Sequence, residues 1–102
     1  DFIYVDDLVV GVLKVLEGYC VADPINISNG NPVNIWELVE VILDVCNHRI
    51  SPLFDTTKPT AVPYRVLDNT KFETLFGKTK KTSLEDGLGK TVEWYTSSLS
   101  RE

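Results

Sequence analysis

The chain has 102 residues, of which 43% are hydrophobic and 25% are charged. This size predicts one small domain with one core, because two separate cores need a longer chain. The net charge of -5 and the scattered basic residues argue against a basic face that binds nucleic acid. The sequence also lacks the roughly 18 uninterrupted apolar residues of a membrane-spanning helix, so we expect no membrane partner.

The N-terminal segment predicts a short strand followed by a helix. Asp1–Val5 alternates aromatic and aliphatic side chains, Asp6 is predicted to cap the helix, and Asp7 lies in its first turn. The helix is apolar on nearly all sides except for a stripe formed by Gly11, Lys14, Glu17 and Gly18. Such a helix is normally covered on several sides, so we expect a homo-oligomer or a missing partner domain.

The chain is also expected to be a fragment of a longer protein. It opens on Asp1 in the middle of an apolar pattern, and it contains no methionine. A start upstream of Asp1 would supply the part that covers the first helix.

The middle of the chain predicts two further strands around the clearest amphipathic helix. Residues 24–30 read as a strand that ends in a glycine turn, and residues 50–54 read as an edge strand because Pro52 interrupts them. Between these strands, Asn34 and Glu37 have the spacing of a capping box at a helix start. The apolar residues then repeat at helical spacing: Ile35, Leu38, Val39, Ile42, Leu43 and Cys46.

The C-terminal part predicts a proline-containing loop over residues 55–63 and then two helices. Asp68 is placed to cap a short helix that ends at Gly77. Thr82 and Glu85 have capping-box spacing before the last helix. The predicted core stripe of that helix consists of Leu84, Leu88, Val92, Tyr95 and Leu99.

The two cysteines, Cys20 and Cys46, follow apolar helical patterns and have no spacing typical of a metal or redox site. We expect both to be buried, reduced thiols of a cytoplasmic protein. No metal site is predicted.

The candidate binding site consists of Arg65, Lys58 and Asp68. Pro59 and Pro63 stiffen the chain before Arg65, and the planar fork of an arginine near a capped helix start suits phosphate oxygens. Spacing alone favours a plainer alternative, in which Arg65 pairs with Asp68 or another surface carboxylate.

No catalytic or cofactor-binding residue is predicted. Asp6 and Asp7 are adjacent at a helix start and point in different directions, so capping explains them better than paired catalysis. His48 lies after a helix with no nucleophile pattern nearby, and we expect it to be solvated. None of the four tyrosines is followed four positions later by lysine, and no GxxGxxG turn for a dinucleotide is present.

Four segments, taken in order, resemble the C-terminal third of the extended short-chain dehydrogenase/reductases. This family comprises the NAD-dependent epimerases and dehydratases of sugar nucleotides. The segment around Arg65 is most similar to the form found in GDP-fucose synthase-like epimerase/reductases. The matching segments are Asp1–Asp7, Pro24–Gly30, Lys58–Pro59 with Pro63–Asp68, and Ser83–Tyr95.

The resemblance implies an α/β fold in which residues 1–102 form the C-terminal substrate-binding portion of an extended Rossmann-type protein, with about four helices and short strands. The dinucleotide-binding domain would lie upstream. The intact parent would use NAD or NADP to epimerise, dehydrate or reduce a nucleotide sugar, whereas this chain alone would bind neither cofactor and be inactive.

The resemblance also implies residue roles within this portion. Arg65 would contact the nucleotide diphosphate, Lys58 would lie in the same segment, and Asp68 would act as a cap and orienting partner. The alternative is a stand-alone interaction or dimerisation module without catalysis.

Overall fold

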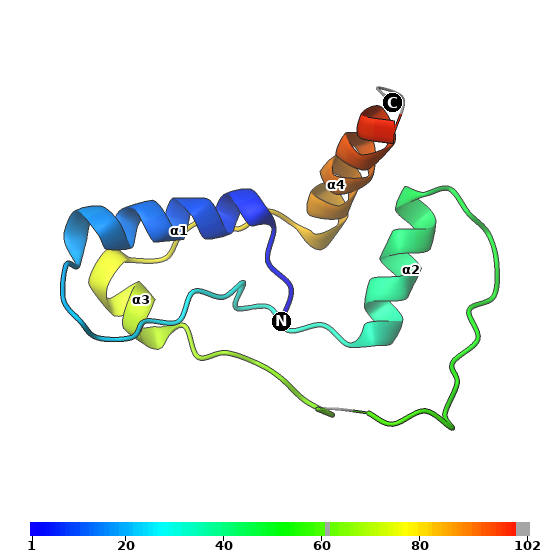
Figure 1. Ribbon diagram of the computed structural model, residues 1–102, viewed down its shortest axis with the longest axis horizontal. Helices are drawn as coiled ribbons and strands as arrows, with labels where there is room; N and C mark the ends of the chain where they lie inside the picture. The colour runs from blue at the N-terminus through cyan, green and yellow to red at the C-terminus, as the bar shows by residue number, and fades with distance from the viewer. Residues whose placement is uncertain (61, 100–102) are drawn as a thin grey trace.

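A computed structural model describes residues 1–60 and 62–99 of the chain. The described residues form four helices joined by long irregular segments: α1 (Val5–Gly18), α2 (Ile35–Val45), α3 (Thr70–Phe76) and α4 (Leu84–Leu99). α1 and α3 lie at one end of the molecule, while α2 packs against α4 at the other end (Figure 1). The four helices agree with the expected number.

The predicted strands are not confirmed, because no β-ladder forms among the described residues. Side chains take the backbone donors of the segment expected to be the second strand. Ser28 N donates to Asn69 Oδ1 at 3.2 Å, and Asn29 N donates to Asp1 Oδ1 at 3.2 Å. A strand needs a neighbouring strand to satisfy its backbone groups. The short strands and the Rossmann-type arrangement therefore stay predictions.

The start of α1 corrects the predicted cap at Asp6. The N-cap residue is Tyr4, whose side chain makes no capping hydrogen bond, and Asp6 and Asp7 both lie in the first turn. The carboxylate of Asp7 instead accepts two hydrogen bonds from Thr82, at 2.7 Å from its N–H and at 3.0 Å from its hydroxyl. Asp7 thereby ties the start of α1 to the segment that leads into α4.

The starts of the other helices follow the predictions to within one residue. Asn34 caps α2 as expected, because its side-chain oxygen accepts from Glu37 N at 2.8 Å. α4 is capped by Ser83, whose hydroxyl accepts from Asp86 N at 3.1 Å. The predicted cap at Thr82 is one residue too early, since the hydroxyl of Thr82 is bonded to Asp7.

Two glycines allow extended segments to pack directly on helix backbones. A Cβ atom on Gly11 of α1 would lie 2.9 Å from Cγ2 of Ile27, and one on Gly87 of α4 would lie 3.3 Å from Cβ of Tyr4. Both glycines are buried. Any larger side chain there would push residues 24–30 or the N-terminal segment away from its helix.

The interior is very small. Phe72 of α3 is the one hydrophobic side chain that is fully buried among residues 1–60 and 62–99, and it packs against Phe76 with ring centroids 5.0 Å apart. In the stripe predicted for α4, Leu84, Leu88 and Val92 are half-buried, but Tyr95 and Leu99 are exposed. The predicted core of the last helix is thus only partly covered.

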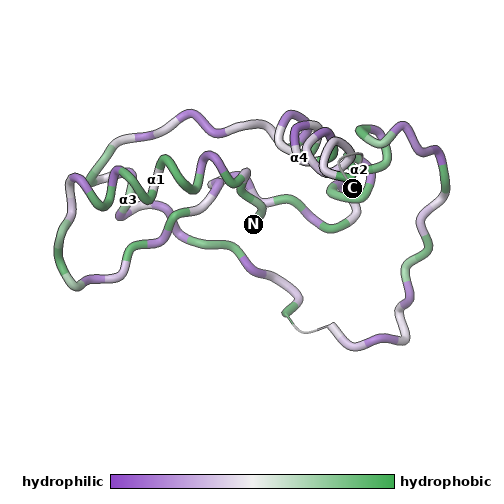
Figure 2. Tube along the Cα trace, turned by 45° about the horizontal axis from the view of Figure 1, so that its top comes forward, coloured by the Kyte–Doolittle hydropathy of each residue, from purple (hydrophilic) through white to green (hydrophobic). Residues whose placement is uncertain are grey.

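The apolar surface of α1 is open to solvent. Leu13 and Leu16 expose 50% and 64% of their surface. Figure 2 shows the hydrophobic residues along α1. Further exposed apolar side chains of this helix are Val5, Leu8, Val9, Val10 and Val12. This chain therefore leaves the apolar surface of α1 uncovered.

The accessible surface of 8141 Å² is large for a mass of 11.5 kDa. A compact monomer of this mass exposes about 5800 Å². The radius of gyration is 16.7 Å, compared with about 13 Å for a compact chain of this length. The chain alone is not a self-sufficient compact domain, and roughly 2300 Å² of excess surface is available for another protein part.

Both cysteines are exposed and free, which corrects the prediction of buried thiols. Cys20 follows the end of α1, and Cys46 is the C-terminal cap of α2, so both thiols lie at exposed helix ends.

Within the described part, no helix has both the length and the hydropathy that spanning a bilayer requires. The same residues contain no cluster of three or more His, Cys, Asp or Glu side chains suited to a metal ion.

Candidate functional site

Arg65 lines a groove of about 720 Å³. Three separate parts of the chain form its walls: the N-terminus, the start of α2, and residues 62–66. The backbone oxygen of Arg65 accepts a hydrogen bond from the nitrogen of Asp1 at 3.2 Å, which holds two of these walls together. The lining residues are Asp1, Phe2, Pro32, Val33, Asn34, Ile35, Glu37, Val62, Pro63, Tyr64, Arg65 and Val66.

The side chain of Arg65 is exposed. In the part of the chain that the structure describes, Lys71 and Asp23 form the sole ion pair, and the guanidinium of Arg65 has no hydrogen-bond partner. The plainer alternative, a surface pair between Arg65 and Asp68, is not formed. An arginine fork that no carboxylate occupies remains available for an anion.

The N-cap residue of α3 is Asn69, whose side chain makes no capping hydrogen bond, so the predicted cap at Asp68 is one residue too early. Asp68 instead makes a local turn contact with Thr70. Its Oδ1 atom accepts from Thr70 N at 2.9 Å and from Thr70 Oγ1 at 2.6 Å. The side-chain hydrogen bond, followed by the backbone one, holds the pKa of Asp68 below its usual value of 3.8. Asp68 does not line the groove. A direct role for this residue toward a substrate stays a prediction.

Lys58 lies on an exposed turn outside the groove lining. The turn is held by Asp55, whose Oδ1 atom accepts hydrogen bonds from the N–H and the hydroxyl of Thr57. Thr57 also holds the pKa of Asp55 below its usual value of 3.8 through its hydroxyl and its N–H. Arg65 therefore lines the groove, whereas Lys58 does not. The binding role of Lys58 stays a prediction.

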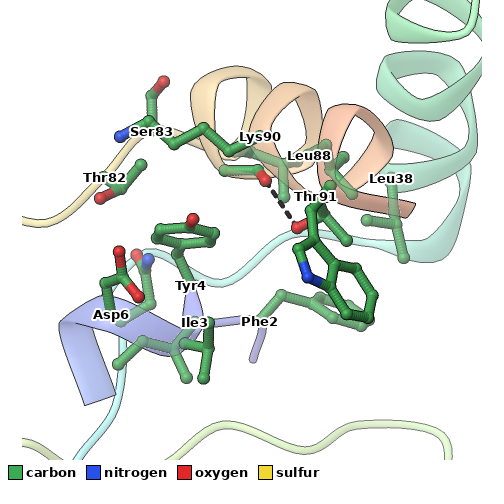
Figure 3. Close-up of a pocket in the computed structure, with 15 residues that line it drawn as sticks. Phe2, Ile3, Tyr4, Asp6, Leu38, Thr82, Ser83, Leu88, Lys90 and Thr91 are labelled. Atoms are coloured by element: carbon green, nitrogen blue, oxygen red, sulfur yellow. Dashed lines mark hydrogen bonds between the residues drawn. The ribbon is translucent and has the colours of Figure 1, made fainter. Parts of the chain in front are cut away.

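A second groove, of about 610 Å³, lies between the N-terminal segment and the first turns of α4 (Figure 3). Its walls are mainly apolar: Phe2, Ile3, Tyr4 and Val5 face Leu38 of α2 and Leu84, Leu88 and Trp94 of α4. Lys90 Nζ lies 5.5 Å from the ring centroid of Tyr4. Sequence reasoning missed this groove because its residues come from distant segments, although the aromatic residues at both ends of the chain were visible.

A charged cluster joins the end of α1 to α3. Lys71 Nζ donates to Asp23 Oδ2 and, at 2.7 Å, to the oxygen of Pro24, while the hydroxyl of Tyr19 donates to Asp23 Oδ2 at 2.8 Å. The Lys71 hydrogen bond, with a smaller contribution from Tyr19, lowers the pKa of Asp23. The hydrogen bond to Asp23 raises the pKa of Lys71. These partners satisfy one another, so the cluster is a structural contact and not a second anion site.

Several curated proteins are similar to this chain over nearly its whole length. GDP-L-fucose synthase 1 of Arabidopsis thaliana is 37% identical over 93% of the chain, and GDP-L-fucose synthase of Sinorhizobium fredii is 32% identical over 98%. GDP-L-fucose synthase of Escherichia coli is 29% identical over 99% of the chain. These relatives confirm the resemblance to GDP-fucose synthase-like epimerase/reductases.

The match covers only part of each relative. The chain spans 29% of the Arabidopsis protein, 32% of the Sinorhizobium protein and 34% of the Escherichia protein. This is consistent with a C-terminal part of such an enzyme. No family model matches the chain, and no solved structure matches it.

The contacts of Asp68 generate a prediction about pH. Because the pKa of Asp68 is lowered from 3.8 by Thr70, its contribution to stability should be complete above that value and lost as the pH falls through the lowered pKa. An NMR titration of the Thr70 amide should therefore show a midpoint below 3.8. In Asp68→Asn, which keeps an acceptor for Thr70, this titration step should vanish while α3 persists.

Asp68→Ala provides the contrast, since it removes the acceptor and should loosen the first turn of α3. Retention of the Thr70 amide shift in Asp68→Ala would show that Asp68 does not accept this hydrogen bond in solution.

Proposed function

We propose that this chain is the C-terminal, substrate-binding part of an NAD(P)-dependent sugar-nucleotide epimerase/reductase. In this proposal Arg65 binds the diphosphate of the nucleotide sugar. The observation that carries the proposal is that Arg65 lines a groove while its guanidinium has no partner in the described part of the chain. The names of the three relatives described above, each a GDP-L-fucose synthase, support a substrate that carries a nucleoside diphosphate.

The groove has the size and chemistry that such a ligand needs. Ligand sites commonly have volumes of about 300 to 1000 Å³, with mostly apolar walls and a few convergent polar groups. The groove of about 720 Å³ has apolar walls from Val33, Ile35 and Val62, and Arg65 supplies the cation. A guanidinium binds phosphate oxygens through two parallel N–H donors, which fixes orientation as well as charge.

The residues present do not fit a nicotinamide dinucleotide. A dinucleotide site needs a glycine-rich turn between a strand and a helix, where backbone N–H groups meet the pyrophosphate. The one Gly-x-Gly sequence here, Gly87-Leu88-Gly89, lies inside α4, and its N–H groups belong to the helix. We propose that the cofactor site and the reacting groups belong to a dinucleotide-binding part outside residues 1–102.

The apolar surface of α1 also supports a separate dinucleotide-binding part outside residues 1–102. A parent of the relatives' length would have about two thirds of its mass available to cover the roughly 2300 Å² of excess surface. An obligate interface of this kind is commonly 2000 Å² or more and hydrophobic. We propose that α1 packs on the dinucleotide-binding part.

When that part is absent, we expect the chain to associate with itself through α1. Sedimentation of the purified chain should show dimers or larger species, because the exposed leucines are then covered by a second copy. Leu13→Glu with Leu16→Glu should shift the chain towards monomer. Glu17→Lys, on the polar stripe of the same helix, should leave the association unchanged. A concentrated wild-type sample that sediments as a monomer would contradict this expectation.

We also expect the isolated chain to have no turnover. Purified chain, supplied with GDP-L-fucose and either NAD or NADP, should produce no reduced cofactor, because the dinucleotide turn and the tyrosine/lysine pair are not in its sequence. The full-length relative from Escherichia coli, assayed alongside, is the positive control. Cofactor reduction by the chain alone would refute the proposed division of roles.

The role of Arg65 is tested by calorimetric titration with GDP. A charge-assisted, bidentate contact is worth about 1.5 to 3 kcal/mol, so Arg65→Ala should weaken binding by roughly tenfold to a hundredfold. Arg65→Lys should recover part of the affinity, because it restores the charge without the planar fork. Arg49→Ala is the matched control, since Arg49 is exposed and lines neither groove. Equal affinities for wild type and Arg65→Ala would remove Arg65 from the site.

A further inference from the structure

The segment that begins at Arg65 and ends at Asn69 (the Arg65 segment) is held to the rest of the chain at both ends. At its first residue, the backbone oxygen of Arg65 accepts a hydrogen bond from the nitrogen of Asp1 at 3.2 Å. At its last residue, Oδ1 of Asn69 accepts from Ser28 N at 3.2 Å. The carboxylate of Asp1 in turn accepts from Asn29 N at 3.2 Å. Two neighbouring residues, Ser28 and Asn29, thus hold both ends of the segment, one of them through Asp1.

The attachment point at Ser28 is buried and packed on α1. Ser28 exposes 1% of its surface. The preceding residue, Ile27, lies directly on the backbone of α1, because a Cβ atom on Gly11 would be 2.9 Å from its Cγ2. The buried hydroxyl of Ser28 has no hydrogen-bond partner among the described residues, so its backbone N–H makes the link to Asn69. A hydrogen bond is stronger in such a site than at an exposed position, because the local dielectric is low.

Between its two ends, the Arg65 segment is exposed to solvent. Among the described residues, the bond from Asp1 is the only hydrogen bond between residues 65–68 and a distant part of the chain. An exposed stretch of chain adopts many backbone conformations unless other contacts fix it. Only the conformations that keep Arg65 at the groove can bind an anion there, so the measured affinity falls with the fraction of the chain in those conformations.

We propose that Asp1 and Asn69 are positioning residues for the anion site, because their side-chain oxygens fix the Arg65 segment and so keep Arg65 in the groove wall. This inference rests on the proposed function, in which Arg65 binds the diphosphate. It adds that the affinity for the diphosphate depends on two side chains that act through the backbone of the chain.

At Asp1, charge and positioning have opposite effects on binding. Asp1 lines the same groove as Arg65, so removal of its negative charge alone should tighten the binding of an anion. Asp1→Asn and Asp1→Ala remove the same charge, but only asparagine keeps a side-chain oxygen that can accept from Asn29 N. In calorimetric titrations of the 102-residue chain with inorganic pyrophosphate, Asp1→Ala should bind about fivefold more weakly than Asp1→Asn, which is the effect of one hydrogen bond.

Asn69→Ala removes the second attachment. The side chain of Asn69 makes no capping hydrogen bond, so α3 should persist in this variant. Asn69→Ala should bind pyrophosphate about fivefold more weakly than wild type. The amide of Ser28 should also exchange its hydrogen faster, because it loses its acceptor. In Asn69→Asp, which keeps an acceptor oxygen, the slow exchange should return.

Asn26→Ala is the matched control for Asn69→Ala. Asn26 is exposed, lines neither groove, and makes no hydrogen bond among the described residues. This variant should bind pyrophosphate as wild type does and keep the slow exchange of the Ser28 amide.

The outcomes separate this inference from the proposed function. Pyrophosphate binding that is lost in Arg65→Ala supports the proposed function. If Asp1→Ala then binds as tightly as Asp1→Asn, or Asn69→Ala as tightly as Asn26→Ala, the positioning role of that residue is overturned and the proposed function stands. A folded wild-type chain that binds no pyrophosphate would overturn both.

Discussion

The structure of this chain is dominated by apolar surface that its own small interior does not bury. Phe72 is the single hydrophobic side chain that the described residues bury fully, yet α1 alone exposes a row of valines and leucines. Burying apolar surface contributes about 25 cal/mol per Å², so an uncovered surface of this size forgoes a large part of the usual driving force for folding. α2 packs against α4, α1 lies with α3, and long irregular connections join these two pairs (Figure 1).

Hydrogen bonds between side chains and backbone groups connect the segments that the sequence predicted to be strands. Asp7 bonds to Thr82, Asn69 bonds to Ser28, and Asp1 bonds to Asn29, so each contact joins segments that lie far apart in the sequence. Each such hydrogen bond contributes about 0.5 to 1.5 kcal/mol, which is less than a well-packed core provides. These contacts nevertheless determine which segments meet. The bond between Asp1 and the backbone oxygen of Arg65 brings the N-terminus beside residues 62–66 and so forms part of the groove.

The sequence predicted local features well and distant contacts poorly. Hydrophobic periodicity located all four helices, and the cap at Asn34 was correct because a capping box depends on residues three positions apart. The cap predicted at Asp6 was wrong, since α1 already begins at Val5 and Asp6 lies in its first turn. The bond between Asp7 and Thr82 was not predicted, because no local pattern connects Thr82 to α1. The strands failed for a related reason. Alternation indicates a strand, but a strand forms only where a second strand pairs with it, and none does so among the described residues.

The same distinction applies to the candidate site. The position of Arg65 after two prolines was visible in the sequence, and so was its possible pairing with Asp68. The structure shows that Asp68 accepts from Thr70, and that the guanidinium of Arg65 has no hydrogen-bond or ion-pair partner among residues 1–60 and 62–99. The groove itself was hidden for another reason. Its walls come from segments that are far apart in the sequence, and only the tertiary approach of residues 62–66 to the start of α2 brings Arg65 beside them. A local pattern can thus mark a residue suited to bind an anion, but it cannot supply the groove around that residue.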